Sequence, residues 1–241
     1  MLKFRGGEGL VDEAVILEYL RGDYIVKILD SHLCGNHPFI ALEFMDGGEL
    51  IDQLRRKLIG IPTALRLFHI LAQAVYHLHE KGIVHLDLRP HNILLSQKLS
   101  SVLNGEESQP DALRSALAGL KLIDFGLSRA LPECPIQNIS EYRANFDIGT
   151  PYAPDDQYDM RDPTTAMDVF ALGRIGHDLV YGISPTWNVN YRWNMDPDRT
   201  RFEIDTALND RLDSLLEQMQ HEEPSSRPGI DFVVEELEKL F

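Results

Sequence analysis

The pattern of apolar residues changes its period at the Gly-Gly pair of positions 47 and 48. Before this pair, residues 24–30 and 38–44 form two short apolar runs that are rich in β-forming residues. After it, residues 62–82 repeat apolar side chains at helical spacing. We therefore predict a small lobe with paired strands, a linker near residues 45–48, and a larger, mainly helical lobe.

Other elements follow from the same patterns. Residues 12–20 place apolar side chains at helical spacing, with acidic residues in the first turn. Residues 96–119 are rich in polar residues and are predicted to form an exposed insertion, with a short helix at DALRSALAG, between two strands. Beyond Asp124 we expect a long irregular stretch to about residue 164, followed by helices near 165–182, 207–220 and 229–240.

Length and charge narrow the class of protein. A chain of 241 residues can form one large domain or two small lobes that share a cleft, a preferred ligand site. The formal net charge is −15, and residues 121–241 hold 23 of the 38 acidic residues. This charge disfavours a nucleic-acid or anionic-lipid binder and favours a basic protein partner, although solubility alone would also account for it.

The number of cysteines and the length of the apolar runs indicate the cellular compartment. Cys34 and Cys134 are the only cysteines, so neither a disulfide framework nor a cysteine-based zinc site is indicated, and a reducing compartment fits. No apolar run approaches the roughly 18 residues of a membrane helix, and the first residues lack a signal-peptide core. Cytoplasm is the default expectation, and a signal-free secreted effector would share these features.

Two polar strings carry the candidate chemistry. Residues 85–92 have the sequence HLDLRPHN, and residues 120–126 have the sequence LKLIDFG. They resemble the catalytic loop, H-R-D-L-K-P-x-N, and the magnesium-binding D-F-G of the eukaryotic-type protein kinase family. A carboxylate, an amide five residues later and a second carboxylate after a strand are the groups that phosphoryl transfer from ATP requires.

This resemblance implies a role for each polar residue of the two strings. Asp87 would accept or orient the proton of the substrate hydroxyl, while Asn92 and Asp124 would bind Mg²⁺ on the ATP phosphates. Arg89 stands where the family usually has Lys, and would offer its positive charge to the transferring phosphoryl group. His85 is expected to be a structural residue that makes hydrogen bonds.

Three later strings distinguish protein kinases from small-molecule phosphotransferases of the aminoglycoside and choline type, which share the arrangement of catalytic residues. They are GTPYAPD at 149–155, DVFALG at 168–173 and SSRP at 225–228. By resemblance to the ends of protein kinase activation segments, Asp155 is predicted to pair with Arg227. Asp168 matches the acid of the helix beneath that segment, and Thr150 matches a Thr that contacts the catalytic Asp in Ser/Thr kinases.

The linker resembles a kinase hinge. In FIALEFMDGGEL, Leu42 would be the gatekeeper, and the Glu43 carbonyl and Met45 amide would contact adenine. Glu49 is a candidate ribose ligand, and the alternative is an acid at a helix start beside a Gly-Gly turn.

The small lobe departs from the family pattern. Glu13 matches the C-helix Glu, and Lys3 is the match for the ATP-binding Lys that pairs with it. Lys27 is rejected, because no acid-bearing helix lies between it and the hinge. With Lys3 so early, GGEG at 6–9 cannot form the Gly-rich loop over the phosphates, and weaker nucleotide binding and slower transfer are expected.

We therefore predict an α+β, two-lobed protein-kinase-like fold: a single domain over 1–241, with a reduced N-lobe at 1–45 and a C-lobe at 46–241. The expected activity is phosphorylation, with Mg²⁺ and ATP, of Ser or Thr in a protein substrate that we expect to be basic. Alternatives are a pseudokinase that acts as a binding scaffold and a small-molecule phosphotransferase. The oligomeric state is left open.

One cluster of basic residues has a simpler interpretation. His77, His79 and Lys81 lie near the end of the helix predicted at 62–82, where they could form a metal-binding face. Positive charge is favourable at the C-terminus of a helix, and we prefer that explanation.

Overall fold

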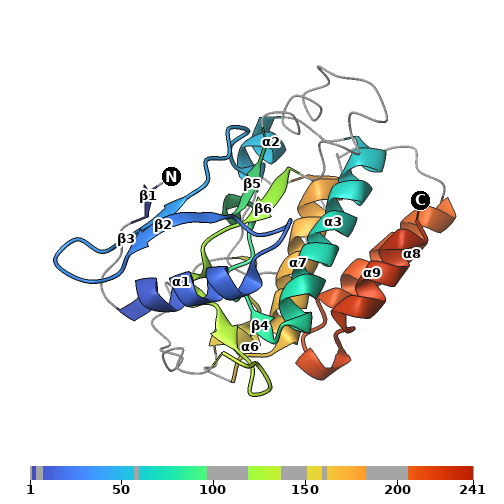
Figure 1. The fold of residues 1–241 in the computed structure, drawn as a ribbon. Helices are drawn as coiled ribbons and strands as arrows, with labels where there is room; N and C mark the ends of the chain where they lie inside the picture. Colours follow the sequence, from blue (N-terminus) through green and yellow to red (C-terminus); the bar gives the residue numbers. More distant parts are fainter. Residues whose placement is uncertain are drawn as a thin grey trace.

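The computed structural model consists of a small lobe and a larger helical lobe that pack on each other (Figure 1). The stretches that it describes are residues 2–3, 8–56, 60–96, 119–136, 151–158, 162–182 and 206–240. The α+β character and the two lobes agree with the prediction from the period change.

The small lobe contains, among these residues, a three-stranded antiparallel sheet and one helix. The strands β1 (Leu2–Lys3), β2 (Ile28–His32) and β3 (Phe39–Leu42) lie in the order β1-β3-β2. The helix α1 (Glu8–Leu20) begins earlier than predicted and contacts β2 and β3. It buries Ile16, Leu17 and Leu20, and each fully buried side chain of this kind contributes on the order of 2 kcal/mol to stability.

The first predicted strand, at 24–30, is only partly correct, because β2 begins at Ile28. The preceding residues pair with the large lobe instead: Val26 N donates to Leu122 O at 3.1 Å, and Leu122 N donates to Tyr24 O at 2.8 Å. This pairing across the lobes competes with the local strand and ties the small lobe to β6 (Leu120–Leu122).

The Gly-Gly linker fits closely against the large lobe. Gly47 N donates to Leu95 O, and Leu95 N donates to Gly48 O, both at 2.9 Å. A Cβ atom on Gly47 would lie 2.2 Å from the carbonyl oxygen of Ser96, so this approach of two backbones requires glycine.

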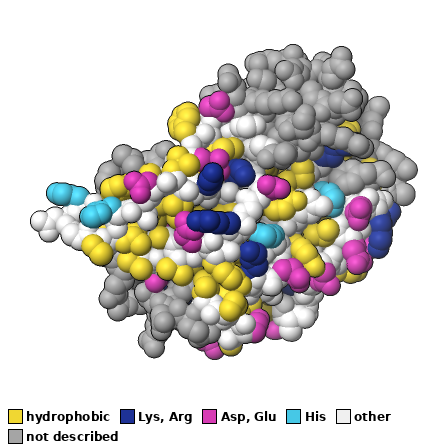
Figure 2. Space-filling model, in the orientation of Figure 1, with side chains coloured by type: hydrophobic (Ala, Val, Ile, Leu, Met, Phe, Trp, Pro, Cys, Tyr) yellow, Lys and Arg dark blue, Asp and Glu magenta, His cyan; other side chains and the backbone are white. Residues whose placement is uncertain are grey.

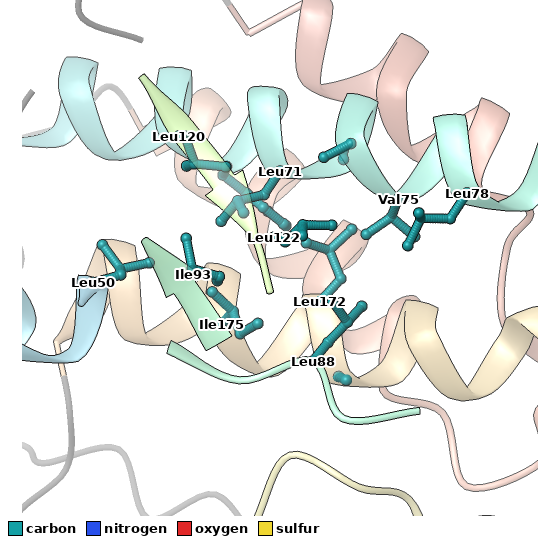
Figure 3. Close-up of a cluster of buried hydrophobic side chains, with 14 of the residues drawn as sticks. Leu50, Leu71, Val75, Leu78, Leu88, Ile93, Leu120, Leu122, Leu172 and Ile175 are labelled. Atoms are coloured by element: carbon teal, nitrogen blue, oxygen red, sulfur yellow. The ribbon is translucent and has the colours of Figure 1, made fainter. Parts of the chain in front are cut away.

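The large lobe is built on the long helix that residues 62–82 predict. Its helices are α2 (Leu50–Arg56), α3 (Ile61–Glu80), α6 (Asp155–Tyr158), α7 (Thr165–Tyr181), α8 (Thr206–Met219) and α9 (Ile230–Glu238), with 3-10 turns at Pro90–Asn92, Phe125–Leu127 and Pro224–Ser226. Figure 3 shows the core: Leu71 and Val75 of α3 lie toward β6 and α7, which contributes Leu172 and Ile175. The predicted helices of the second half are therefore confirmed to within a few residues.

Short strands in the large lobe hold the two polar strings. β4 (Ile83–Val84) pairs with β7 (Arg129–Ala130), and β5 (Ile93–Leu95) pairs with β6. The stretch after Asp124, predicted to be irregular, thus contains β7 and α6. The predicted insertion falls between the paired strands β5 and β6, and its residues 97–118 lie outside the described residues.

Two surface observations complete the description. On the face shown in Figure 2, acidic and basic side chains are interspersed rather than separated into large patches. Among the described helices, none combines the length and the apolarity that a membrane span requires.

Candidate active site

Asp87 and Asn92 are brought together by a turn between β4 and β5. Asn92 Nδ2 donates to Asp87 Oδ2 at 2.7 Å and to the Asp87 carbonyl at 2.9 Å. The 3-10 turn Pro90–Asn92 closes the loop, with a hydrogen bond from Asn92 N to Arg89 O at 2.9 Å. The spacing of five residues in the sequence therefore places an amide directly against a carboxylate.

The environment of Asp87 favours its neutral form. Burial raises the pKa of Asp87 above its ordinary value, and the charge of Asp124 acts in the same direction. His85, Arg89 and the hydrogen bond from Asn92 oppose this rise, with Arg89 Nε 3.7 Å from Asp87 Oδ1. A carboxylate with a raised pKa is a stronger base, which suits a group that receives a proton.

Asp124 follows β6 and lies beside this pair because β6 is the partner of β5. Ile123 N donates to Asn92 O at 3.0 Å, which fixes the end of β6 against the loop of residues 85–92. Asp124 itself adopts a left-handed conformation with φ 63° and ψ 69°, which Asp tolerates better than most residues. The two strings far apart in sequence thus present one amide and two carboxylates in one place.

His85 links the two strings. Its Nδ1 accepts from Asp87 N at 3.2 Å, and its Nε2 lies 3.1 Å from Ile123 O. The ring is buried and packs on Phe125 with a centroid distance of 4.8 Å, so His85 occupies a structural position.

Asp168 of α7 binds the backbone at the start of the loop formed by residues 85–92. Its Oδ2 accepts from His85 N at 2.7 Å, and its Oδ1 accepts from Leu86 N at 2.9 Å. His79 Nε2 lies 3.0 Å from the same carboxylate. Burial alone would raise the pKa of Asp168, but the hydrogen bond and charge of His79, helped by His85, lower it below its ordinary value.

The cluster of basic residues at the end of α3 makes contacts with other elements. His79 binds Asp168 as described, His77 Nε2 lies 3.0 Å from Leu20 O, and Lys81 Nζ donates to Tyr19 O at 3.0 Å. The preferred explanation, favourable charge at the end of their own helix, is therefore incomplete. His77 and Lys81 instead satisfy carbonyl groups at the end of α1, whose last turn contains no basic residue.

The predicted partner of Arg227 is wrong by one residue. Arg227 Nη2 donates to Asp156 Oδ1 at 2.5 Å and Nη1 donates to Asp156 Oδ2 at 3.3 Å, and both side chains are buried. Asp155 is exposed at the start of α6. The physical reason is burial: α6 turns Asp156 toward the interior, where it meets Arg227, and leaves Asp155 exposed.

Three buried polar residues, two in residues 151–158 and one in α7, were not identified from the sequence. Tyr152 Oη donates to Asp178 Oδ2 at 2.6 Å, and Gln157 Nε2 donates to the carbonyl of Leu86 at 2.8 Å. Burial raises the pKa of Tyr152, and the adjacent Asp178 carboxylate strengthens the effect. No periodic pattern marked these residues, because residues 151–154 precede α6 and are not helical.

The small-lobe candidates are only partly described. Glu13 is fully buried in α1, and Lys3 lies on β1 in register with Ile40 of β3. The side chain of Lys3 lies outside the described residues, as does Thr150. The pairing of Lys3 with Glu13 and the role of Thr150 stay predictions.

The predicted hinge residues form the connection between the lobes. Leu42 is buried at the end of β3, and Met45 is half-buried. Glu43 is held by two contacts with Lys27: Glu43 N donates to Lys27 O at 2.9 Å, and Lys27 N donates to Glu43 Oε1 at 2.8 Å. Glu49 forms an isolated antiparallel bridge with Leu94 at the start of α2.

Comparison with known proteins identifies the class of this molecule. The model of the protein kinase domain matches residues 3–237. The chain belongs to the protein kinase family, as the catalytic-loop and D-F-G strings indicated.

Individual relatives are distant and longer. The chain is 28% identical to the Serine/threonine-protein kinase ste20 of Emericella nidulans over 178 residues, which are 73% of this chain and 18% of that protein. It is 30% identical to the Calcium/calmodulin-dependent protein kinase type 1B of Rattus norvegicus over 219 residues, 86% of this chain and 55% of that protein. The chain therefore spans between about a fifth and about half the length of these curated relatives.

Proposed function

We propose that this chain transfers the γ-phosphoryl group of ATP to Ser or Thr hydroxyls of a protein substrate. The observation that carries the proposal is the constellation of Asp87, Asn92 and Asp124, held together by the 2.7 Å hydrogen bond between Asn92 and Asp87 and by the backbone contact of Ile123 with Asn92. Phosphoryl transfer depends on positioning and on charge stabilisation, and this constellation provides both.

Asp87 is the proposed base. Its carboxylate would accept, or orient, the proton of the attacking hydroxyl, and burial keeps its basicity above that of an exposed Asp. Arg89, whose Nε lies 3.7 Å from Asp87 Oδ1, would place positive charge beside the oxygens of the transferring group.

Asn92 and Asp124 fit a magnesium ion by their chemistry. Both described side-chain hydrogen bonds of Asn92 use Nδ2, which leaves the carbonyl Oδ1 as the ligand atom of that amide. The Asp124 carboxylate adds a second oxygen donor, and Mg²⁺ prefers one or two such protein ligands together with phosphate oxygens. When bound, the ion would neutralise charge on the phosphates.

The small lobe and hinge complete the proposal. Lys3, paired with Glu13, would contact the phosphates, while the Glu43 carbonyl and Met45 amide would bind adenine and Glu49 the ribose. The name of the Emericella nidulans relative, a Serine/threonine-protein kinase, supports transfer to Ser or Thr, as does Thr150. The acidic C-terminal half supports a basic substrate, and a cytoplasmic location is part of the same proposal.

The test is a transfer assay with radiolabelled ATP, Mg²⁺ and a generic basic protein. Wild-type protein is expected to transfer phosphate, while Asp87→Asn and Asp124→Asn should each lower the rate at least about 100-fold. Asp210→Asn, at an exposed position of α8, is the matched control. Nucleotide binding without transfer by the wild type would instead support the pseudokinase, and labelling of an aminoglycoside or choline alone would support the small-molecule phosphotransferase.

A further inference from the structure

Leu86, the residue before Asp87, has an unfavourable backbone conformation. Its φ is 65°, in the left-handed region that side chains with a Cβ atom disfavour. Such a conformation persists only when the surrounding contacts fix it. The contacts that fix Leu86 therefore also determine where the chain presents the carboxylate of Asp87.

Both peptide groups of Leu86 are held by buried side chains. On its amino side, Leu86 N donates to Asp168 Oδ1 at 2.9 Å. On its carboxyl side, the carbonyl accepts from Gln157 Nε2 at 2.8 Å, and Gln157 is 3% exposed. Because the second contact involves the peptide bond that joins Leu86 to Asp87, Gln157 acts on the residue that carries the reacting carboxylate.

The other end of this peptide bond is also occupied. Asp87 N donates to His85 Nδ1 at 3.2 Å. A peptide plane whose carbonyl and N–H are both bonded cannot rotate without breaking one of these contacts. Loss of the Gln157 contact would leave a buried carbonyl unsatisfied and free that plane to turn.

The position of Gln157 depends on how the segment of residues 151–158 is docked. Two buried contacts fix this segment on the large lobe: Tyr152 with Asp178, at 2.6 Å, and Asp156 with Arg227, at 2.5 Å. Gln157 directly follows Asp156 in α6. Docking of the segment therefore brings the Gln157 amide to the Leu86 carbonyl.

The side chain of Leu86 is held by apolar contacts alone. It is buried in a small cluster with Val84 and Met167, against which Leu127 and Leu131 pack. Hydrophobic packing is non-directional and requires no anionic group. The apolar cluster and the Gln157 hydrogen bond together hold the residue in its strained conformation.

We propose that Gln157 is a positioning residue for Asp87, through which the docked segment 151–158 sets the orientation of the peptide bond between Leu86 and Asp87. This inference rests on the proposed kinase function. Catalysis would then depend on docking of the segment, through the neutral hydrogen bond from Gln157 to the Leu86 carbonyl.

The experiment compares Gln157→Met, which keeps the length and volume of the side chain but removes the donor, with the matched control Gln218→Met at an exposed position of α8. For Gln157→Met we expect kcat to fall about 10- to 100-fold while KM for ATP stays within about twofold. Gln218→Met is expected to keep wild-type values. Because a purely structural role would lower the melting temperature without this split, both variants are assayed well below their melting temperatures.

Amide hydrogen exchange gives the second measurement. The Asp87 amide should exchange at least about tenfold faster in Gln157→Met than in wild type. In Gln218→Met its exchange rate should equal that of wild type. An active wild type with unaltered kcat in Gln157→Met would overturn this inference alone. Absence of transfer by the wild type would refute the proposed function itself, so that the two failures are distinguishable.

Discussion

At the scale of single residues, Asp168 shows how a buried carboxylate organises a loop. It is fully buried in α7 and accepts hydrogen bonds from the backbone of His85 and Leu86 and from the side chain of His79. Removing one partner from such a group leaves the others unsatisfied, which costs more than the hydrogen bond alone provides. Its contribution to stability is therefore expected to depend on its charge.

The contribution of Asp168 to the free energy of unfolding should depend on pH. Because its pKa is lowered in the folded protein, the ionised form stabilises the fold above the ordinary Asp pKa of about 3.9. This stabilisation is lost as the pH falls through the lowered pKa. Asp168→Asn should thus lower the free energy of unfolding by about 3 kcal/mol at pH 7. The difference from wild type should shrink below about pH 4.

Urea denaturation at several pH values measures this difference. Asp162→Asn, at an exposed position before α7, serves as the control and should differ little from wild type at every pH. If the difference in unfolding free energy between Asp168→Asn and wild type grew on acidification, the pKa of Asp168 would not be lowered in the folded protein.

At the scale of elements, the ends of α1 and α3 are joined by reciprocal contacts. Lys81 Nζ donates to Tyr19 O at 3.0 Å, Tyr19 Oη donates to Lys81 O at 3.3 Å, and the Lys81 ammonium lies 5.2 Å from the centroid of the Tyr19 ring. Because α1 carries the buried Glu13, this junction fixes the helix on the large lobe.

Lys81→Met is predicted to lower the free energy of unfolding by about 1 kcal/mol, because it leaves the Tyr19 carbonyl in the last turn of α1 without this donor. Lys239→Met is the control, since among the described contacts the Lys239 ammonium bonds only to Glu236, three residues earlier. Chemical denaturation of both variants measures the effect, and equal losses of stability would contradict a specific role for the junction.

The linker gives another prediction at this scale. Gly47→Ala places a methyl group 2.2 Å from Ser96 O, so the backbones of the linker and β5 must move apart. A loss of at least about 2 kcal/mol of unfolding free energy is expected. Gly9→Ala is the control, because its Cβ meets nothing within 4 Å and alanine favours the helix. Thermal unfolding of the two variants measures the difference. A Gly47→Ala protein as stable as wild type would disprove the close approach of the linker backbone to Ser96.

At the scale of the whole molecule, buried polar contacts connect parts that are far apart in the sequence. Arg227 joins the segment before α9 to α6 through Asp156, and its guanidinium also lies 5.0 Å from the ring of Phe170 in α7. Both members of the ion pair are almost completely buried, so the loss of one leaves an uncompensated charge.

Paired variants test which acid this contact uses. Asp156→Asn is expected to lower the free energy of unfolding by about 3 kcal/mol, while Asp155→Asn, at the exposed neighbouring position, should change it by less than about 0.5 kcal/mol. Denaturation of the two proteins under identical conditions gives the comparison. The opposite order would restore the pairing of Asp155 that the sequence predicted.

The polar strings were readable from the sequence because each is a short contiguous motif. Asp87 and Asn92 are five residues apart in one turn, and Asp124 closely follows β6, which pairs with β5. The helix at 62–82 was equally clear, because twenty residues of periodic apolar side chains specify one buried face.

The tertiary structure decided the contacts between segments that are distant in the sequence. The residues before β2 pair with β6 instead of extending a strand, His77 and Lys81 bind carbonyls of α1, and Asp156 rather than Asp155 faces Arg227. None of these contacts follows from local spacing. Each forms because packing removes a polar group from water, and that group then needs a partner from a distant segment. The sequence by itself determined the class of fold and the candidate catalytic groups, and the packing of the lobes determined what holds those groups in place.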